Sequence, residues 1–416
     1  MVLLKALVAI LILLFPFGEL GRINIYNEVS TTINDIFVAI VLIGWFIWLI
    51  STNKFSKVSK KQLTKPILFF VLVAFISLIL NSKDLKLPEF LASFLYLLRF
   101  VSYAGIYFVV SGFSMRFKQK ITMLMIISGS LVVLGGFIQY FLYPDLRNLY
   151  YLGWDEHLYR LFSSFLDPNF VASIISLFLI LLISLLFLGF DKRYKTRMFL
   201  ILLSALAFIA LFLTYSRSGY LMFLTGVTVL FLILGRKKYI AILLVIFVVG
   251  LMLLPKGLGG EGVKLLRTAS IISRSEYLDN AITIFKDNPI LGVGFNTYRY
   301  AQKNYGFIDE FSLQTSHAGA GTDNSFIFVL ATTGVIGLVS YLYMWFKIIK
   351  GCRLVLVSGP NQLEDDTKEK RRQKIVSIVI LASCAGLFVN ALFMNSLFYP
   401  FVMEWVWVLL GLRESK

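Results

Sequence analysis

The stretch FVASIISLFLILLISLLFLGF, residues 170–190, contains no charged side chain and is long enough to cross about 30 Å of hydrocarbon as one helix. Comparable apolar runs recur along the chain, for example at residues 121–141 and 239–254. Hydrophobic residues make up 58% of the 416 residues and charged residues only 15%, whereas about a quarter of a soluble globular chain is charged. The sequence therefore predicts an all-α polytopic membrane protein.

The basic residues indicate how this chain is oriented in the membrane. The net charge is +17, but the lysines and arginines lie in short loops between apolar runs and do not form a stripe with stacking aromatic residues. We therefore expect no nucleic-acid partner. Basic clusters at residues 54–65, 116–120, 192–197 and 236–238 are cytoplasmic by the positive-inside rule.

Counting the apolar runs and alternating their sides predicts about twelve transmembrane helices. They fall near residues 2–17, 35–51, 66–81, 90–112, 121–143, 169–190, 198–214, 218–235, 239–254, 323–349, 375–395 and 398–412. This count places every basic cluster and both termini in the cytoplasm, and it leaves a large extracytoplasmic loop between helices nine and ten.

Four segments follow from this topology. They are N-terminal helices at 1–143, helices with outer-face arginine motifs at 144–254, an extracytoplasmic loop domain at 255–322 and C-terminal helices at 323–416. Amphipathic pieces such as residues 277–285 predict short helices in the loop domain, lying over the bundle.

Metal and disulfide chemistry find little support in the sequence. Cys352 and Cys384 lack metal-ligand spacing, and the only two histidines, His157 and His317, are too few for a histidine-rich site. We expect neither a bound metal nor another cofactor.

Three arginines on the predicted outer face are candidates for binding an anion, because a planar guanidinium can donate two parallel hydrogen bonds to a diphosphate. Arg217 lies in the turn TYSRSG at 214–219 and is either a snorkelling anchor or a ligand-binding residue. Arg160 precedes the Asp-Pro-Asn turn at 167–169, where Asp167 is expected to cap a helix. Arg274 is either surface-exposed, paired with Glu276, or part of the anion site.

Asp323 and Asn324 stand where the large loop re-enters the membrane. A carboxylate at that depth is either a helix cap or a base facing a cavity, and the sequence leaves both interpretations open.

Taken together and in order, these motifs resemble the O-antigen ligase and Wzy polymerase family over roughly residues 155–340. The resemblance rests on Arg160 with Asp167-Pro168-Asn169, Ser216-Arg217, Arg274 followed by NPILGVG at 288–294, and Asp323-Asn324 followed after nine residues by GVIG at 334–337. It implies a metal-independent glycosyltransferase of the bacterial cytoplasmic membrane that uses undecaprenyl-diphosphate sugars at the outer face. It also implies that Arg217 and Arg274 hold the donor diphosphate, with Arg160 as a third contact.

This chain departs from the family pattern at one position, and the departure bears on whether it resembles the ligase or the polymerase branch. Family ligases have a histidine followed by Asn, Ser or Gln, then nine residues and Gly-x-x-Gly, whereas this chain has Asp323 in the histidine's place. That form resembles the polymerase branch, although His317, six residues earlier, is a candidate for a shifted equivalent. We therefore predict Asp323, Arg217 and Arg274 as catalytic residues, and Arg160, Asp167, His317 and Asn324 as substrate-binding residues.

The chemistry is consistent with the residues themselves. Arginines would neutralise a diphosphate leaving group without a metal, and Asp323 would take the proton of an acceptor hydroxyl in a single inverting displacement. The leading interpretation is a polymerase that is embedded in the lipid bilayer and joins a lipid-linked glycan to a lipid-linked repeat unit at the outer face of the membrane. The alternatives are a ligase with a lipid, protein or cell-wall acceptor, and a transporter or flippase of lipid-linked sugars. A separate protein that regulates chain length is a possible further partner.

Overall fold

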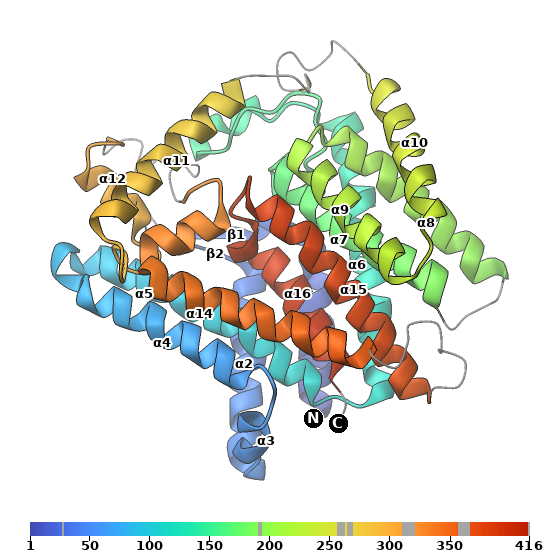
Figure 1. Cartoon of the computed structure of the whole chain (residues 1–416), viewed down its shortest axis with the longest axis horizontal. Helices are drawn as coiled ribbons and strands as arrows, with labels where there is room; N and C mark the ends of the chain where they lie inside the picture. Colours follow the sequence, from blue (N-terminus) through green and yellow to red (C-terminus); the bar gives the residue numbers. More distant parts are fainter. Residues whose placement is uncertain are drawn as a thin grey trace.

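The computed structural model describes residues 1–26, 29–189, 194–255, 263, 269–309, 321–356 and 367–414. Within these ranges the chain is a bundle of α-helices with one two-stranded hairpin (Figure 1). The α-helices are α1 (Val2–Leu14), α2 (Ile33–Thr52), α3 (Phe55–Ser59), α4 (Thr64–Leu80), α5 (Leu87–Ser111), α6 (Met115–Leu142), α7 (Pro168–Leu188), α8 (Tyr194–Leu213), α9 (Arg217–Ile233), α10 (Lys238–Met252), α11 (Ala269–Asp287), α12 (Tyr298–Asn304), α14 (Ser325–Leu356), α15 (Lys368–Ala391) and α16 (Pro400–Arg413). Short 3-10 helices are η1 (Phe15–Gly21), η2 (Ser82–Asp84), η3 (Arg147–Leu152), η4 (Ser163–Phe165) and η7 (Ser396–Phe398).

An α-helix lies at each of the twelve positions where the sequence predicted a membrane span, which confirms the all-α prediction. In the described part of the chain, eight helices are long and apolar enough to cross a membrane: α1 with η1, α2, α5, α6, α7, α8, α14 and α15. Helices α4, α9 and α10 are apolar but shorter, and α16 has 14 residues. Since a span needs about 20 residues, the count of twelve spans stays a prediction.

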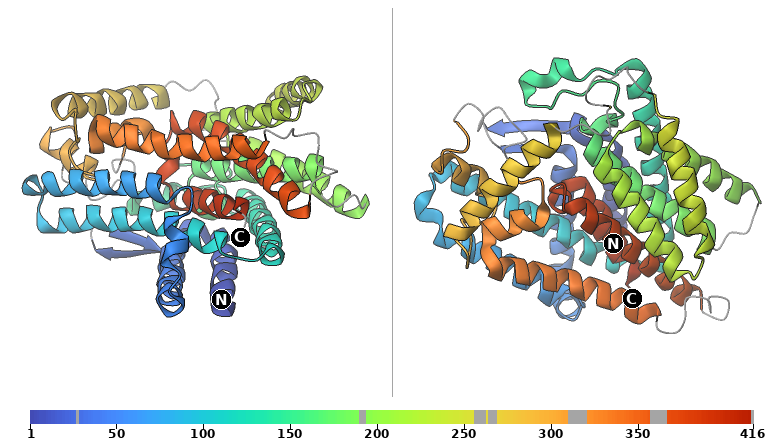
Figure 2. Two further views of the ribbon diagram at one scale, coloured as in Figure 1. Left: turned by 60° about the horizontal axis from the view of Figure 1, so that its bottom comes forward. Right: turned by 45° about the horizontal axis from the view of Figure 1, so that its top comes forward.

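The helices pack as pairs around a common apolar core. Helix α9 packs against α15 and α7, α5 packs against α16, and α4 packs against α14. Helices α11 and α12 lie across one end of the bundle, whereas both chain termini lie at the other end (Figures 1 and 2). The short helices expected within residues 255–322 are therefore present and lie over the bundle.

Helix α14 is interrupted at Gly334, where φ is 64° and ψ is −168°. The segment 288–294 docks into this break: Val335 N donates to Pro289 O at 2.9 Å, and Val293 N donates to Ala331 O at 3.1 Å. A Cβ at Gly334 would collide with the Ile290 backbone, so only glycine allows the two segments to approach so closely. The two glycine-containing motifs of the sequence thus interlock and fix the segment after α11 on α14.

A hairpin that the sequence analysis did not predict connects η1 to α2. Strands β1 (Arg22–Tyr26) and β2 (Val29–Thr32) are antiparallel, with Arg22 opposite Thr32. Thr32 also caps α2: its hydroxyl accepts a hydrogen bond from Asp35 N at 3.2 Å, and Asp35 Oδ2 accepts one from Thr32 N at 2.8 Å. The hairpin therefore leaves Arg22 and Asp35 near the same end of the bundle as α11.

Candidate functional site

A cavity of about 620 Å³ lies at the end of the bundle that α11 covers, and segments from the whole length of the chain line it. Charged side chains of both signs face it. The basic ones are Arg22, Arg99, Arg160, Arg274 and Arg299, and the acidic ones are Glu19, Asp155, Glu156, Asp167 and Asp323. A polar cavity of this size can take a ligand that carries both hydroxyl and phosphate groups.

Arg274 on α11 and Asp323 before α14 are brought together by the fold. Arg274 Nε lies 3.1 Å from Asp323 Oδ2, although 49 positions separate them in sequence. The sequence left three roles open for Arg274: surface exposure, pairing with Glu276 and part of an anion site. The structure pairs it with Asp323 and not with Glu276. Loss of hydration raises the pKa of the Asp323 carboxyl above its usual value, and the Arg274 charge partly offsets this effect.

The first turn of α14 shows which of two adjacent residues caps the helix. Asn324 Oδ1 accepts hydrogen bonds from Phe326 N at 2.9 Å and Ile327 N at 3.1 Å. Asp323 is therefore not needed as a cap, and its side chain, which is 47% exposed, lines the cavity. Asn324, a predicted substrate-binding residue, is absent from the lining, and its Nδ2 donates to Leu392 O at 3.2 Å.

Arg160 is buried and links two of the sequence motifs. Its Nε donates to Thr214 O at 2.9 Å, and its Nη2 donates to Asn169 Oδ1 at 3.3 Å. Asn169 Oδ1 also accepts from Ser216 Oγ at 2.9 Å. Arg160 thus lines the cavity and at the same time ties the Asp-Pro-Asn turn to the turn before α9.

Asp167 caps α7, as the sequence predicted. Its Oδ1 accepts hydrogen bonds from Asn169 N at 2.6 Å and Phe170 N at 3.1 Å. Burial raises the pKa of the Asp167 carboxyl, while these two backbone donors act in the opposite direction. The carboxylate also faces the cavity, so capping and ligand contact are compatible.

Arg217 is the first residue of α9, whose N-cap is Ser216. It lies close enough to Arg274 for the two positive charges to repel each other. It is not among the residues that line the cavity, so the structure places it beside the Arg274 wall and not inside. His317 lies outside the described residues.

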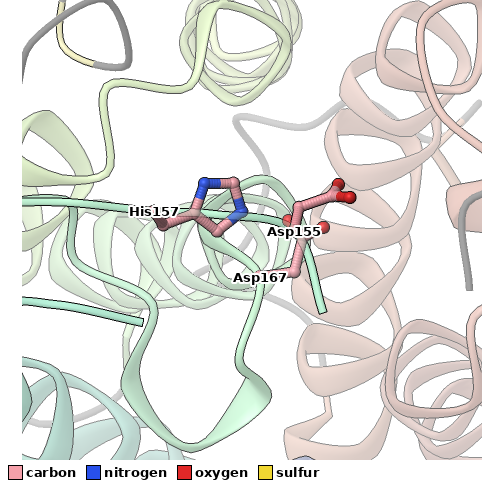
Figure 3. Close-up of side chains that lie close together, drawn as sticks. All are labelled: Asp155, His157 and Asp167. Atoms are coloured by element: carbon pink, nitrogen blue, oxygen red, sulfur yellow. The ribbon is translucent and has the colours of Figure 1, made fainter. Parts of the chain in front are cut away.

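Asp155, His157 and Asp167 form a second polar group on the cavity wall, and the imidazole of His157 lies beside the two carboxylates (Figure 3). Their potential ligand atoms lie within 4.8 Å of one another. However, Arg160 Nη1 lies 3.5 Å from His157 Nδ1. A guanidinium nitrogen can only donate, so Arg160 and a metal ion would compete for the lone pair of Nδ1.

The same group has an unusual proton affinity. Although the Asp155 side chain is solvent-exposed, partial loss of its hydration in the cavity, together with the negative charges of Asp167 and Asp323, raises its pKa to about 6, and Arg160 partly offsets the shift. Two carboxylates this close to each other, with one pKa raised, are suited to sharing a proton.

Several cavity residues were missed by the sequence analysis, above all Arg22, Arg99 and Trp154. Arg99 Nη2 lies 2.9 Å from Asp35 Oδ2, and its guanidinium lies 4.7 Å from the Tyr96 ring centroid. Arg22 pairs with Glu19 at 3.4 Å and lies 5.4 Å from the Trp154 ring centroid. Arg99 could have been found from sequence, because an arginine in the middle of the apolar run 90–112 requires a partner inside the protein.

Comparison with known proteins gives one result. Residues 202–342, about a third of the chain, match the model of the family described as O-antigen ligase. The match includes Arg217, Arg274 and Asp323, but not the hairpin or the 153–170 side of the cavity. No curated protein matches the chain.

Proposed function

From the match that supports its placement in the O-antigen ligase and Wzy polymerase family, we propose that this multi-pass bacterial membrane protein is a polysaccharide polymerase. The enzyme transfers a glycan from an undecaprenyl-diphosphate donor onto a lipid-linked repeat unit. Transfer takes place at the outer face of the cytoplasmic membrane, without a metal and with inversion at the anomeric carbon.

The observation that carries this proposal is the Arg274–Asp323 ion pair on the cavity wall. It sets a cationic group suited to a diphosphate next to a carboxylate suited to a proton. Among the described residues, Arg274 forms its hydrogen bond through Nε, and its two terminal nitrogens remain available for a bidentate contact with phosphate. A donor diphosphate and an acceptor hydroxyl could therefore meet at this pair.

Donor binding would also increase the basicity of Asp323. When the diphosphate draws the Arg274 guanidinium toward itself, Asp323 loses the charge that holds its pKa down, while desolvation continues to raise it. The base then becomes a stronger proton acceptor only when a donor is present.

The bond changes follow from this geometry. The acceptor oxygen attacks the anomeric carbon while Asp323 takes its proton, and the bond from that carbon to the phosphate oxygen breaks. The electron pair leaves with undecaprenyl diphosphate, whose developing charge Arg274 and the neighbouring Arg217 stabilise.

Another part of the cavity lining is suited to sugars. Arg22 and Arg99 are each fixed by a carboxylate and lie against Trp154 and Tyr96, respectively. Planar polar groups beside aromatic rings can contact sugar hydroxyls and the apolar faces of sugar rings. We assign this part of the lining to the acceptor glycan.

The test is to incubate purified protein with a lipid-linked repeat unit in EDTA and to follow the products as a ladder. The proposal expects a ladder in EDTA, with Arg217→Ala and Arg274→Ala both inactive but still present in the membrane. The lysine variants should recover little activity, because a point charge cannot donate the bidentate pair. Full activity of Arg274→Lys would remove the diphosphate argument for that residue.

The family match, by its description, also favours a ligase. The same assay separates the alternatives: transfer only to a different lipid, protein or cell-wall acceptor indicates a ligase, and movement of the lipid-linked sugar without a new glycosidic bond indicates a flippase.

A further inference from the structure

A cluster of basic side chains lies at the end of the bundle opposite the cavity. Helix α16 joins the two ends, because Pro400 lines the cavity and Arg413 is the last residue of the helix. At 1.5 Å per residue its 14 residues separate them by about 20 Å. The basic side chains at the Arg413 end are Lys61, Lys118, Arg372 and Arg413.

The nearby carboxylate of Glu414 is already engaged by two of these cations. Arg413 Nη2 lies 2.6 Å from Glu414 Oε1, and Lys61 Nζ lies 3.8 Å from Glu414 Oε2. Arg413 also donates to Gln62 Oε1 at 2.7 Å. Arg413 and Lys61 are therefore satisfied within the protein.

Lys118 and Arg372 are in a different position. Lys118 is 1% exposed, and its Nζ donates to two backbone carbonyls, Ser111 O at 3.2 Å and Glu414 O at 2.6 Å. Arg372 is 8% exposed, and its Nη1 contacts the thioether of Met115 at 2.7 Å. Within the described part of the chain, Arg372 Nε and Nη2 have no hydrogen-bond partner.

Lys118 and Arg372 are thus two buried positive side chains near each other, and neither is paired with a carboxylate. Such an arrangement is unfavourable unless an anion binds to both. Their charges repel each other. Glu369 is exposed and attracts both, but it forms no ion pair with either within the described residues. The unmatched donors of Arg372 fit the oxygens of a phosphate group.

We propose that Lys118 and Arg372 bind a phosphate group between α6 and α15, supplied by an anionic phospholipid headgroup of the leaflet at this end of the bundle. Basic pockets between helices on the cytoplasmic side bind anionic headgroups in this way. The predicted topology puts this end in the cytoplasmic leaflet. A free phosphate ion is the other source of the same chemistry.

The experiment measures lipid retention and melting temperature of the purified full chain in nanodiscs of phosphatidylcholine, with and without phosphatidylglycerol. Wild-type protein should retain phosphatidylglycerol by native mass spectrometry and should melt at a higher temperature when it is present. Lys118→Gln and Arg372→Gln should each weaken retention by about five-fold. Arg116→Gln is the matched control, because Arg116 lies at the same helix start but is exposed.

A second set of measurements distinguishes the sources. If inorganic phosphate in phosphatidylcholine nanodiscs reproduces the stabilisation, and the two variants lose it, the phosphate site holds and its source is the free ion. Arg372→Lys keeps the positive charge but removes the planar guanidinium and its paired donors. This variant should therefore retain part of the lipid preference even if Arg372→Gln is poorly folded.

Two results would overturn the proposal. One is equal retention of both lipids by wild-type protein without any effect of phosphate. The other is a phosphatidylglycerol preference that Lys118→Gln and Arg372→Gln both leave unchanged, since the lipid would then be held elsewhere on the protein. Because no glycan is transferred in these measurements, their outcome is independent of the proposed polymerase activity.

Discussion

Two adjacent side chains have separate roles at the start of α14. Asp and Asn are both good helix caps, so the sequence Asp323-Asn324 could not show which residue caps and which faces the cavity. The structure gives the cap to Asn324 and pairs Asp323 with Arg274. The ion pair spans two segments far apart in sequence, and no local pattern predicts such a contact.

We expect Asp155 to make the stability of this protein depend on pH, with an effect that solvent screening keeps small because the side chain is exposed. Its pKa of about 6 in the folded chain lies above the value of about 4 of an unfolded chain, so the folded state binds this proton more tightly. The contribution of the group to stability is therefore present below about pH 4 and is lost as pH rises through 6. Asp155→Asn removes the carboxylate, and its melting temperature relative to wild type should increase from pH 5 to pH 8.

The control for this prediction is Asp145→Asn. Hydrogen bonds from Arg147 lower the pKa of Asp145 to about 2, so it stays ionised throughout this pH range. Its melting temperature relative to wild type should not change between pH 5 and pH 8. The same pH trend in both variants would contradict the assignment to Asp155.

At the scale of elements, segment 288–294 packs into the break in α14 at Gly334 and thereby fixes the position of the chain after α11. Gly334→Ala puts a Cβ against the Ile290 backbone and also forces alanine to adopt a φ of 64°. Gly235 is the matched control, because its φ is 66° but it has no atom within 4 Å of an added Cβ. Gly235→Ala should cost about 1 kcal/mol, and Gly334→Ala should cost clearly more and reduce activity as Asp323 shifts. Equal melting temperatures of the two variants would contradict the proposed fit.

Elements with a long hydrophobic pattern could be predicted from the sequence, and those with a short pattern could not. Long apolar runs indicated the positions of the helices, because a single continuous apolar segment can satisfy its own backbone hydrogen bonds in hydrocarbon only as a helix. The hairpin was missed although RINIY at 22–26 alternates polar and apolar residues, since the signal is only five residues long. The motifs around Gly292 and Gly334 were recognised as motifs, but their contact with each other could not be read from either one.

At the scale of the whole molecule, the cavity shows what sequence reasoning could not reach. Four predicted residues line it, namely Arg160, Asp167, Arg274 and Asp323. The lining residues Arg22, Arg99 and Trp154 come from segments in which no site residue was predicted. That part of the lining combines Arg99 from α5 and Arg22 from the hairpin with Trp154, over whose ring Arg22 lies. Residues from such distant segments meet only through the tertiary arrangement of the helices.

The predicted membrane topology can be tested by labelling one position on each side of the membrane. Asn304 on α12 and Lys370 on α15 are both exposed and belong to opposite predicted sides of the membrane. In intact cells an impermeant thiol reagent should label Asn304→Cys and should label Lys370→Cys only after lysis. The native Cys352 and Cys384 are buried and should react little. Protection at 304 together with labelling at 370 would invert the orientation.

The central claim is that the Arg274–Asp323 pair carries out glycosyl transfer, and Asp323→Asn tests it most directly. Asparagine keeps the size of the side chain but removes its basicity. The measurement is the rate at which purified protein joins two lipid-linked repeat units, together with donor affinity, and His317→Ala serves as the control for a shifted histidine base. We expect donor binding to be retained, transfer by Asp323→Asn to fall by about 100-fold or more, and His317→Ala to remain active. Transfer by Asp323→Asn at the wild-type rate, or loss of activity at 317 with tolerance at 323, would contradict the account.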